Sequence, residues 1–526
     1  MVILIKNGTI IDGSGKAPFK GDILIKDNKI VNIDLNRTIK AKADKIIDAS
    51  GLIITPGFID INNESDHWLT LLTQPQLESL IFQGVTSIVI GNNGSSLAPV
   101  FKDSIKSIRK WSNLNVNLNW NSMEEFLNFL KQQKFGVNIG TLVGHSTIKR
   151  GILQEDFRDL IDSEIKQMFY LIEKSLNEGA LGVSIGLRFN HSRLTSFAEI
   201  FGISQIIKKY NAFLNIQPRW EKHDILSFTN EILNLIKTID KPENLKILIS
   251  YLRPYKENVD ELKLSLGLIK QMCEQYNANI HLDINPYTVV SNQMYLYLPE
   301  WILYGNFEMM LEALNEKGNY QRILSELKTK NYNYDKMIIA STQNNISYFN
   351  GKSIRFLAKE RGISAEEMFL EIFKISRGRA IIFYDEILWP ELLGLMEFPC
   401  SIITSQNPGL NFTHFNFLPH FASINTFPRF LGLVNKGVVN MNLSEAVKKI
   451  TLEPALKAGI KKRGLIAKDY FADLVIIEPK EIDYVVDYKK PTQKPKGIKM
   501  VMINGQIALD NDKIINNTAG QILTRA

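Results

Sequence analysis

Short apolar runs broken by turn residues open the chain. Val2 to Ile5 is followed by Asn7-Gly8, and further runs of this kind occupy most of the first fifty residues. Asn and Gly accept the positive φ that a tight hairpin turn needs, so these breaks predict β-hairpins. Residues 472–477 and 497–503 repeat the strand pattern near the other end. The two ends of the chain therefore predict pieces of one small β unit.

The hydrophobic period changes between these ends. Residues 163–176 carry their apolar side chains on one helical stripe, Gly179 ends this helix, and 180–185 has the composition of a strand. Such alternation recurs along most of the chain and predicts a parallel sheet, for which a closed (β/α)₈ barrel is the favoured form at this length. Residues 288–345 break the alternation and predict an inserted helical subdomain.

Composition and charge narrow the class of protein. A chain of 526 residues exceeds one compact domain, and its 45% hydrophobic and 22% charged content is ordinary for a globular protein. The net charge is only +7 and the lysines form no long block, so nucleic-acid binding is not expected. The N-terminus lacks a signal-peptide core, and no apolar run approaches the ~20 residues that span a membrane. We expect a cytoplasmic protein without a membrane partner.

Metal-binding residue types are few and scattered. Cys273 and Cys400 are too few for a disulfide framework or a Cys-rich zinc site. The seven histidines include no His-x-His pair and no pair spaced i, i+4. A newly built zinc site is therefore not expected.

Polar side chains gather where predicted strands end, which is where barrel active sites lie. After the run 51–58, alternation places Asp60, Asn62, Glu64 and Asp66 on one side of the chain. The candidates for a ligand-binding pocket at the strand ends are Glu64, Asn93, His145, Arg219, Arg253, Asp283 and Tyr287.

Two readings stay open for the arginines. Arginine at a barrel mouth commonly clamps a carboxylate or phosphate, so Arg219 and Arg253 are candidates for binding a small anionic ligand. Alternatively, they neutralise the carboxylates of Asp60, Glu64 and Asp283. We hold both readings.

Other strand-end residues also carry alternatives. Asp60, Glu64 and Asp66 either bind a hard cation such as Mg²⁺ or accept hydrogen bonds from neighbouring backbone. His145 is either part of a pocket wall or a structural hydrogen-bond partner.

Several motifs resemble one family in order along nearly the whole chain. They are GLIITPGFIDI, QGVTSIVIGNNGSSLAP, LVGHSTIKRG, GALGVSIGL, DINPYT, NTFPRFLG and RGLIAKDYFADLVIIEP. These motifs are similar to those of the amidohydrolase superfamily, specifically its N-acyl-D-amino-acid deacylase (D-aminoacylase) family. The resemblance implies an α/β fold, a (β/α)₈ TIM barrel with a small β-sandwich domain built from both chain termini and a helical insertion. The expected boundaries are 1–55 and 462–526 for the β-sandwich, 56–461 for the barrel, and 288–345 for the insertion.

The departures from this family fall on its functional positions. The resemblance implies zinc as the family cofactor, but the family's ligand positions hold Asn62, Glu64, Asn93, Gln217 and Tyr251, and its catalytic aspartate position holds Gln406. Zinc needs several Cys, His or carboxylate donors, whereas amides and a phenol with a pKa near 10 are weak ligands. Without a metal, nothing lowers the pKa of a bound water toward 7.

We therefore expect a pseudoenzyme with a degenerate metal site: an amidohydrolase-family protein inactive as a zinc deacylase, with no cofactor and no assigned catalytic residue. Its retained role would be binding of a small anionic ligand, or complex formation with a protein partner or a second copy. The alternative is an active hydrolase that cleaves C–N bonds of an acylated amino acid or cyclic amide in a remodelled or non-zinc site. The sequence names neither the substrate nor the oligomeric state.

Overall fold

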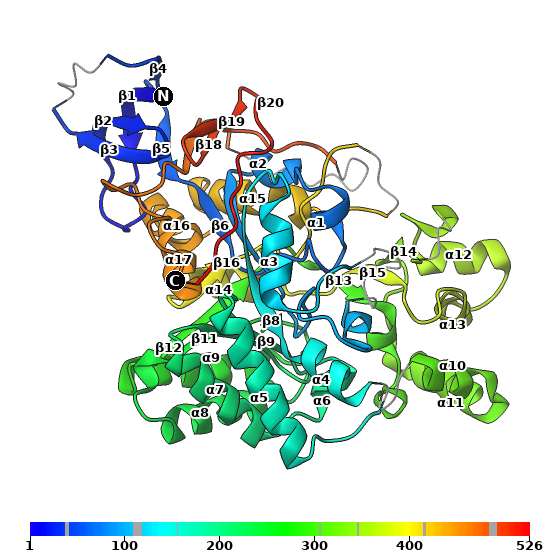
Figure 1. Cartoon of the computed structure of the whole chain (residues 1–526). Helices are drawn as coiled ribbons and strands as arrows, with labels where there is room; N and C mark the ends of the chain where they lie inside the picture. The colour runs from blue at the N-terminus through cyan, green and yellow to red at the C-terminus, as the bar shows by residue number, and fades with distance from the viewer. Residues whose placement is uncertain are drawn as a thin grey trace.

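A computed structural model covers the chain and describes residues 1–36, 42–108, 118–154, 156–303, 307–343, 347–413, 417–482 and 492–525. Figure 1 shows a central barrel surrounded by helices, a β unit that contains the N-terminus, and a lobe that carries helices α10 to α13. The β unit and this lobe lie on opposite sides of the barrel.

Eight parallel strands form the barrel, in the order β6-β7-β8-β9-β10-β11-β12-β16. They are β6 (Phe58–Asp60), β7 (Val85–Ile90), β8 (Asn138–Gly144), β9 (Gly182–Gly186), β10 (Phe213–Gln217), β11 (Lys246–Ile249), β12 (Asn279–Ile284) and β16 (Ser401–Ile403). Just beyond the ends of β16 and β6, the N–H of Gln406 donates to the carbonyl of Asn62 at 2.9 Å. The predicted barrel is confirmed.

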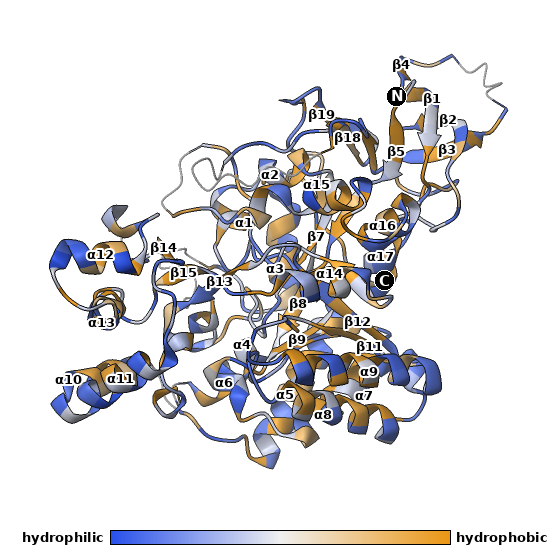
Figure 2. Cartoon of the chain, turned by 180° about the vertical axis from the view of Figure 1, so that it is seen from behind, coloured by the Kyte–Doolittle hydropathy of each residue, from blue (hydrophilic) through white to orange (hydrophobic). Residues whose placement is uncertain are grey.

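Helices surround these strands because their apolar stripes need a partner surface. Barrel helices longer than one turn are α2 (Glu78–Phe82), α3 (Met123–Lys131), α4 (His145–Leu153), α5 (Asp162–Asn177), α7 (Phe197–Lys209), α8 (Ile225–Thr238), α9 (Val259–Gln275), α14 (Trp389–Glu397), α15 (Ala422–Asn435), α16 (Leu443–Ile450) and α17 (Leu452–Ala458). Single turns form α1 (Thr70–Thr73) and α6 (Asn190–Arg193). The barrel strands are mostly hydrophobic in Figure 2, whereas the helices around them carry both polar and apolar residues.

The β unit is one sheet of nine strands with the order β20-β19-β18-β17-β5-β1-β2-β3, and β4 pairs with β1. Its strands are β1 (Val2–Ile10), β2 (Phe19–Lys26), β3 (Lys29–Asp34), β4 (Lys45–Asp48), β5 (Ile53–Pro56), β17 (Leu474–Ile477), β18 (Ile498–Ile503), β19 (Gln506–Asp510) and β20 (Lys513–Ile514). Strand β5 pairs with β1 on one side and β17 on the other, so both ends of the chain build this unit as predicted. The exact domain boundaries remain a prediction.

The segment predicted as a helical insertion lies between barrel strands β12 and β16. Its helices are α10 (Phe307–Asn315), α11 (Lys317–Lys330), α12 (Ile354–Arg361) and α13 (Ala365–Ile375). The segment also contributes an antiparallel sheet of β13 (Val289–Gln293), β14 (Met337–Ser341) and β15 (Ile381–Asp385). This lobe is therefore mixed rather than purely helical, and its sheet continues beyond residue 345. No helix among the described residues is long and apolar enough to cross a membrane.

Candidate functional site

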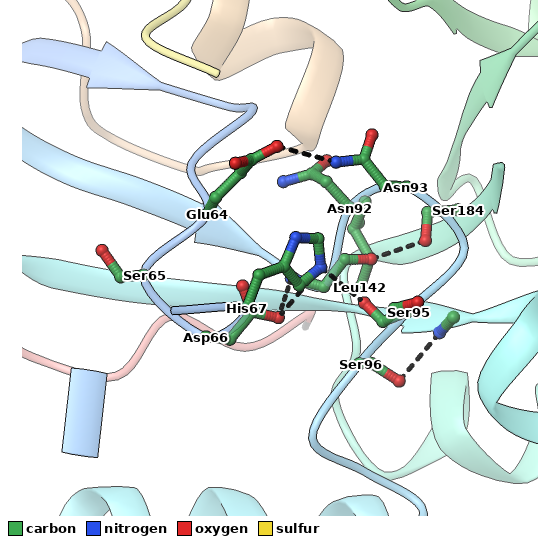
Figure 3. A network of polar contacts seen from close by, with 12 residues as sticks. Glu64, Ser65, Asp66, His67, Asn92, Asn93, Ser95, Ser96, Leu142 and Ser184 are labelled. Atoms are coloured by element: carbon green, nitrogen blue, oxygen red, sulfur yellow. Dashed lines mark hydrogen bonds and ion pairs between the residues drawn. The ribbon is translucent and has the colours of Figure 1, made fainter. Parts of the chain in front are cut away.

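The chain leaves β6 through a fully buried loop of polar residues. Asn63 fixes the turn, because its Oδ1 accepts the N–H of Ser65 at 3.1 Å and the Ser65 hydroxyl at 2.6 Å. Asp66 accepts the N–H of Gly91 at 2.9 Å, which ties this loop to the end of β7. Figure 3 shows Glu64 and Asn93 projecting from these two neighbouring loops toward each other. The close packing of parallel strand ends thus creates the site.

Three of these strand ends contribute a cluster around Glu64. Its Oε1 accepts the Tyr251 hydroxyl at 2.7 Å and the Asn93 amide at 2.9 Å, and the same amide lies 3.2 Å from the Tyr251 hydroxyl oxygen. All three side chains are buried. The cluster therefore joins three of the five positions that the family resemblance assigns to metal ligands.

Asp283 at the end of β12 is the centre of a second cluster. It accepts hydrogen bonds from the Asn62 amide, from the Ser250 hydroxyl at 2.8 Å, from the Gln406 amide at 3.0 Å and from the Tyr251 N–H at 3.2 Å. Burial raises the pKa of Asp283, and these donors oppose that rise. Asn62 and Gln406 are therefore held in place by a single carboxyl group.

A charged group continues this network. Arg253 donates to Oε1 of Gln406 at 2.7 Å, and Glu221 accepts Arg188 at 2.6 Å and the Gln217 amide at 2.9 Å. Burial alone would raise the pKa of Glu221, but Arg188 and Arg253 outweigh it and hold that pKa below its usual value. Glu221 and Arg188 were not predicted from the sequence. They lie in loops past the strands, where residue alternation gives no signal.

Burial also dominates the pKa values of the carboxyl groups at the end of β6 and in the loop after it. It raises the pKa of Asp60 to about 6, of Glu64 to about 7 and of Asp66 to about 8, although each group accepts hydrogen bonds that favour its charged form. Near neutral pH, Asp66 and part of the Glu64 population therefore hold a proton that an exposed carboxyl group would have lost.

Several buried polar atoms of the network have no hydrogen-bond partner among the described residues. They are Oδ1 of Asn62, Oδ1 of Asn93, Oε1 of Gln217 and Nη1 of Arg253. Leaving a buried acceptor or donor unpaired costs about 1–3 kcal/mol. Three acceptors and one donor at the barrel mouth are thus left without a hydrogen-bond partner in this network.

Arg219 lies outside this network, although the sequence suggested it for the pocket. Its guanidinium donates to Glu231 at 2.6 Å and to the carbonyls of Arg193 and Thr195. Strand β10 ends at Gln217, so alternation no longer controls where the Arg219 side chain points. Neither predicted role, clamping a ligand or neutralising Glu64, is served by these contacts.

His145 also lies apart, in a buried cluster at the start of α4. Its Nδ1 is 3.0 Å from the Ser192 hydroxyl and its Nε2 is 3.3 Å from Glu199, which also pairs with Lys149. Burial lowers the pKa of His145. Ser192, His145 and Glu199 are linked in the order of a hydrolytic triad, but the Ser192 hydroxyl is fully buried and also lies 2.6 Å from the Ser146 hydroxyl. These contacts match the structural reading of His145.

Tyr287 lies at the edge of the mouth. Its hydroxyl donates to the carbonyl of Asn425 at 3.1 Å, and its ring packs edge-on against His420 with centroids 5.7 Å apart. His420 Nδ1 accepts the N–H of Ala422, so Nε2 carries the proton toward the carbonyl of Val289. Burial lowers the pKa of His420 to about 3. Tyr287 and His420 therefore form a neutral wall.

An apolar cavity adjoins this wall. It has a volume of about 340 Å³ and lies where the insertion sheet meets the segment after residue 417. Its apolar lining includes Val289, Ile338, Phe383, Leu418 and Phe421. The mouth thus combines a polar network with neighbouring apolar space.

The chain is thus a (β/α)₈ barrel protein with polar side chains gathered at its strand ends. No family model matches the chain. It is 26% identical over 525 residues to D-aminoacylase of Alcaligenes xylosoxydans xylosoxydans. The alignment covers 99% of this chain and 97% of the relative. It is 25% identical over 523 residues to N-acyl-D-aspartate deacylase of the same organism, covering 99% and 94%. The chain is thus similar to D-aminoacylase and a related deacylase over nearly its whole length, as the sequence resemblance predicted.

A solved structure agrees with this fold. The N-acyl-D-glutamate deacylase of Bordetella bronchiseptica, a complex with zinc and a phosphonate inhibitor, matches with a TM-score of 0.82 and 22% identity, covering 100% of this chain and 99% of that one. The match supports the barrel together with the β unit and the insertion.

Proposed function

We propose that this amidohydrolase homologue binds a small anionic ligand at the barrel mouth and does not catalyse zinc-dependent deacylation. One observation carries the proposal: Glu64 Oε1 accepts the Tyr251 hydroxyl at 2.7 Å and the Asn93 amide at 2.9 Å. Side chains at three positions that the family resemblance assigns to metal ligands thus hydrogen-bond directly to one another. They do so where that resemblance implies a metal would lie.

The chemistry of the donor set is the first support. Zinc is held by Cys, His and carboxylate side chains, and structural and catalytic sites use at least three of them. Among the five family ligand positions only Glu64 is a carboxylate; the others are three amides and a phenol. Within the ranges that the structure describes, no three His, Cys, Asp or Glu side chains are grouped so that they could hold a metal ion. These residues do not fit zinc, and no reaction step is routed through it.

The charge balance supports an anionic ligand. Two partly buried guanidinium groups, those of Arg188 and Arg253, lie within ion-pair distance of the single carboxylate of Glu221. Burial raises the pKa of Glu64 to about 7, so near neutral pH this group adds less negative charge than an exposed carboxylate would. A carboxylate-bearing ligand would balance the remaining positive charge, and Nη1 of Arg253 has a hydrogen bond left to donate.

The experiment is a metal and activity measurement on purified protein. Zinc content is measured by mass spectrometry, and hydrolysis of N-acetyl-D-amino acids is assayed beside D-aminoacylase as the positive control. We expect far less than one zinc per chain and no hydrolysis above background. About one tightly bound zinc per chain together with hydrolysis would refute the proposal.

A second candidate function is an active hydrolase that acts on an amide bond without zinc. It is favoured by Glu64, because burial raises the pKa of this carboxyl to about 7, near the value that suits a general acid or base. The test is turnover of a panel of acylated amino acids and cyclic amides by the parent protein, Glu64→Ala and Arg253→Ala. Turnover that both substitutions abolish supports this candidate; a parent protein inactive on the whole panel counts against it.

A further inference from the structure

Two thiols far apart in sequence meet at the opposite end of the barrel from the site. Cys273 lies in the last turns of α9, and Cys400 directly precedes β16. Their Sγ atoms are 3.6 Å apart across 127 residues of sequence. Both thiols are free and partly exposed, and they are the only two cysteines of the 526-residue chain.

The two sulfur atoms need to move only a short distance to form a disulfide bond. A disulfide bond is ~2.05 Å long, so the sulfurs need to approach by about 1.5 Å, a shift that two side chains can share. Cys273 is on a helix and Cys400 is in a turn, and a turn adapts its backbone more easily than a strand. The geometry therefore permits a bond without unfolding of the barrel.

The surroundings favour a reactive thiolate. Lys449 of α16 donates to the carbonyls of Phe398 and Ser401, which flank the turn that carries Cys400. Lys457 and Glu453 of α17 also face the pair. Contact with Cys273, aided by the Lys449 ammonium, lowers the pKa of the Cys400 thiol to about 7. The thiolate is the nucleophile in cysteine chemistry, so Cys400 is suited to react first.

We propose that Cys273 and Cys400 form a reversible intramolecular disulfide when the protein meets a peroxide. The Cys400 thiolate attacks one oxygen of hydrogen peroxide; the O–O bond breaks, the sulfur becomes a sulfenic acid, and the departing hydroxide takes a proton to become water. The sulfur of Cys273 then displaces the sulfenic hydroxyl, which leaves as a second water with the Cys273 proton. Two thiols and one peroxide thus give one disulfide and two water molecules.

The bond would join α9 to the entrance of β16. It would close a large loop of the chain and restrict the unfolded state, which raises stability in the loop-entropy model. We therefore expect the oxidised protein to melt at a higher temperature than the reduced protein. The proposal is independent of whether the barrel mouth is catalytic.

The experiment counts thiols in the native full-length protein. The protein is treated with hydrogen peroxide, the oxidant is removed, and free thiols are measured with a disulfide reagent in denaturant. We expect the count to fall from two to none, a monomer on a non-reducing gel, a linked peptide pair containing Cys273 and Cys400 by mass spectrometry, and full recovery after a dithiol reductant. Cys273→Ser and Cys400→Ser are the matched controls, and neither should form an intramolecular link.

An unfolded sample shows which peroxide dose is enough to oxidise accessible thiols. The same peroxide dose is applied to protein in urea, where both thiols are accessible. Two free thiols remaining in the native protein at a dose that oxidises the unfolded chain would refute the proposal. Disulfide-linked dimers, or sulfinic acid without the linked peptide pair, would also refute it.

Discussion

The Tyr251 hydroxyl donates a 2.7 Å hydrogen bond to Glu64 across 187 residues of sequence. Tyr251 has a φ of +61°, a left-handed conformation that is uncommon for a tyrosine. The surroundings hold it there, because its N–H donates to Asp283 at 3.2 Å while its ring lies under the Arg253 guanidinium. One residue therefore links the two carboxyl clusters of the barrel mouth.

Removal of this hydroxyl tests that link. Tyr251→Phe keeps the ring and its contact with Arg253 but takes one donor away from buried Glu64. We expect the free energy of unfolding to fall by about 1–2 kcal/mol, the usual cost of leaving a buried acceptor short of a partner. Urea denaturation at pH 8 measures this change, with Tyr170→Phe, on an exposed face of α5, as the control. Equal stability of both variants would show that the bond does not contribute.

The pKa of Glu64 predicts a pH dependence of stability. Burial raises this pKa from 4.5 to about 7, so the folded chain keeps a proton that the unfolded chain has lost between these values. The stability contributed by Glu64 is therefore present below about pH 4.5 and lost as pH rises through 7. The full loss is on the order of 3 kcal/mol at 1.36 kcal/mol per pKa unit.

Glu64→Gln isolates this effect. The glutamine carbonyl still accepts from Tyr251 and Asn93, but it has no proton to lose. We expect this variant to gain stability relative to the parent as pH rises from 5 to 8, in urea denaturation at each pH. Glu312→Gln, on an exposed position of α10, is the control and should show no such trend. A difference between Glu64→Gln and the parent that stays constant with pH would contradict the prediction.

The fold could be predicted where the local hydrophobic pattern of a segment matches the burial of the element that it forms. Val85–Ile90 (VTSIVI) is rich in β-branched residues and becomes a fully buried barrel strand. The insertion sheet was missed because its strands pair only with one another, and β15 lies far along the chain from β13. Short strands whose partners are distant leave no local pattern.

The site was predictable only as far as the strands determine it. Asp283 lies in β12, Glu64 and Asn93 lie in the loops after β6 and β7, and the parallel arrangement brings these three strand ends together. Arg219 also lies in a loop after its strand but turns away toward Glu231 of α8, and strand alternation cannot tell these loop positions apart. The contact between Cys273 and Cys400 likewise depends on the packing of α9 against β12, which composition cannot reveal.

Contacts of Lys222 hold the insertion against the barrel. Its ammonium lies 2.5 Å from Glu386 and within 5.8 Å of the ring centroids of Tyr255, Tyr297 and Tyr384. Lys222 follows β10, whereas Glu386 and two of these tyrosines belong to the inserted segment. We expect Lys222→Gln to lower the free energy of unfolding by about 2 kcal/mol, because a buried carboxyl loses its ion pair.

A double-mutant cycle separates this ion pair from general damage. Lys222→Gln, Glu386→Gln and the double variant are compared with the parent by urea denaturation. We expect the double variant to be less destabilised than the sum of the two single variants by about 1 kcal/mol or more. Additive effects would show that the two side chains do not interact measurably in solution.

The last prediction concerns metal and stability. A protein that binds a metal in its folded state is stabilised by mass action, so a chelator lowers its melting temperature. Here the side chains at the family's ligand positions form hydrogen bonds with one another, with Asp283 and with Glu221. We therefore expect a chelator to leave the melting temperature unchanged and excess Zn²⁺ not to raise it, with D-aminoacylase as the control. Asn62→His combined with Glu64→His should not restore hydrolysis, because Asn93, Gln217 and Tyr251 would still be poor zinc ligands. A chelator-induced fall of several degrees that one divalent metal reverses would show a working metal site.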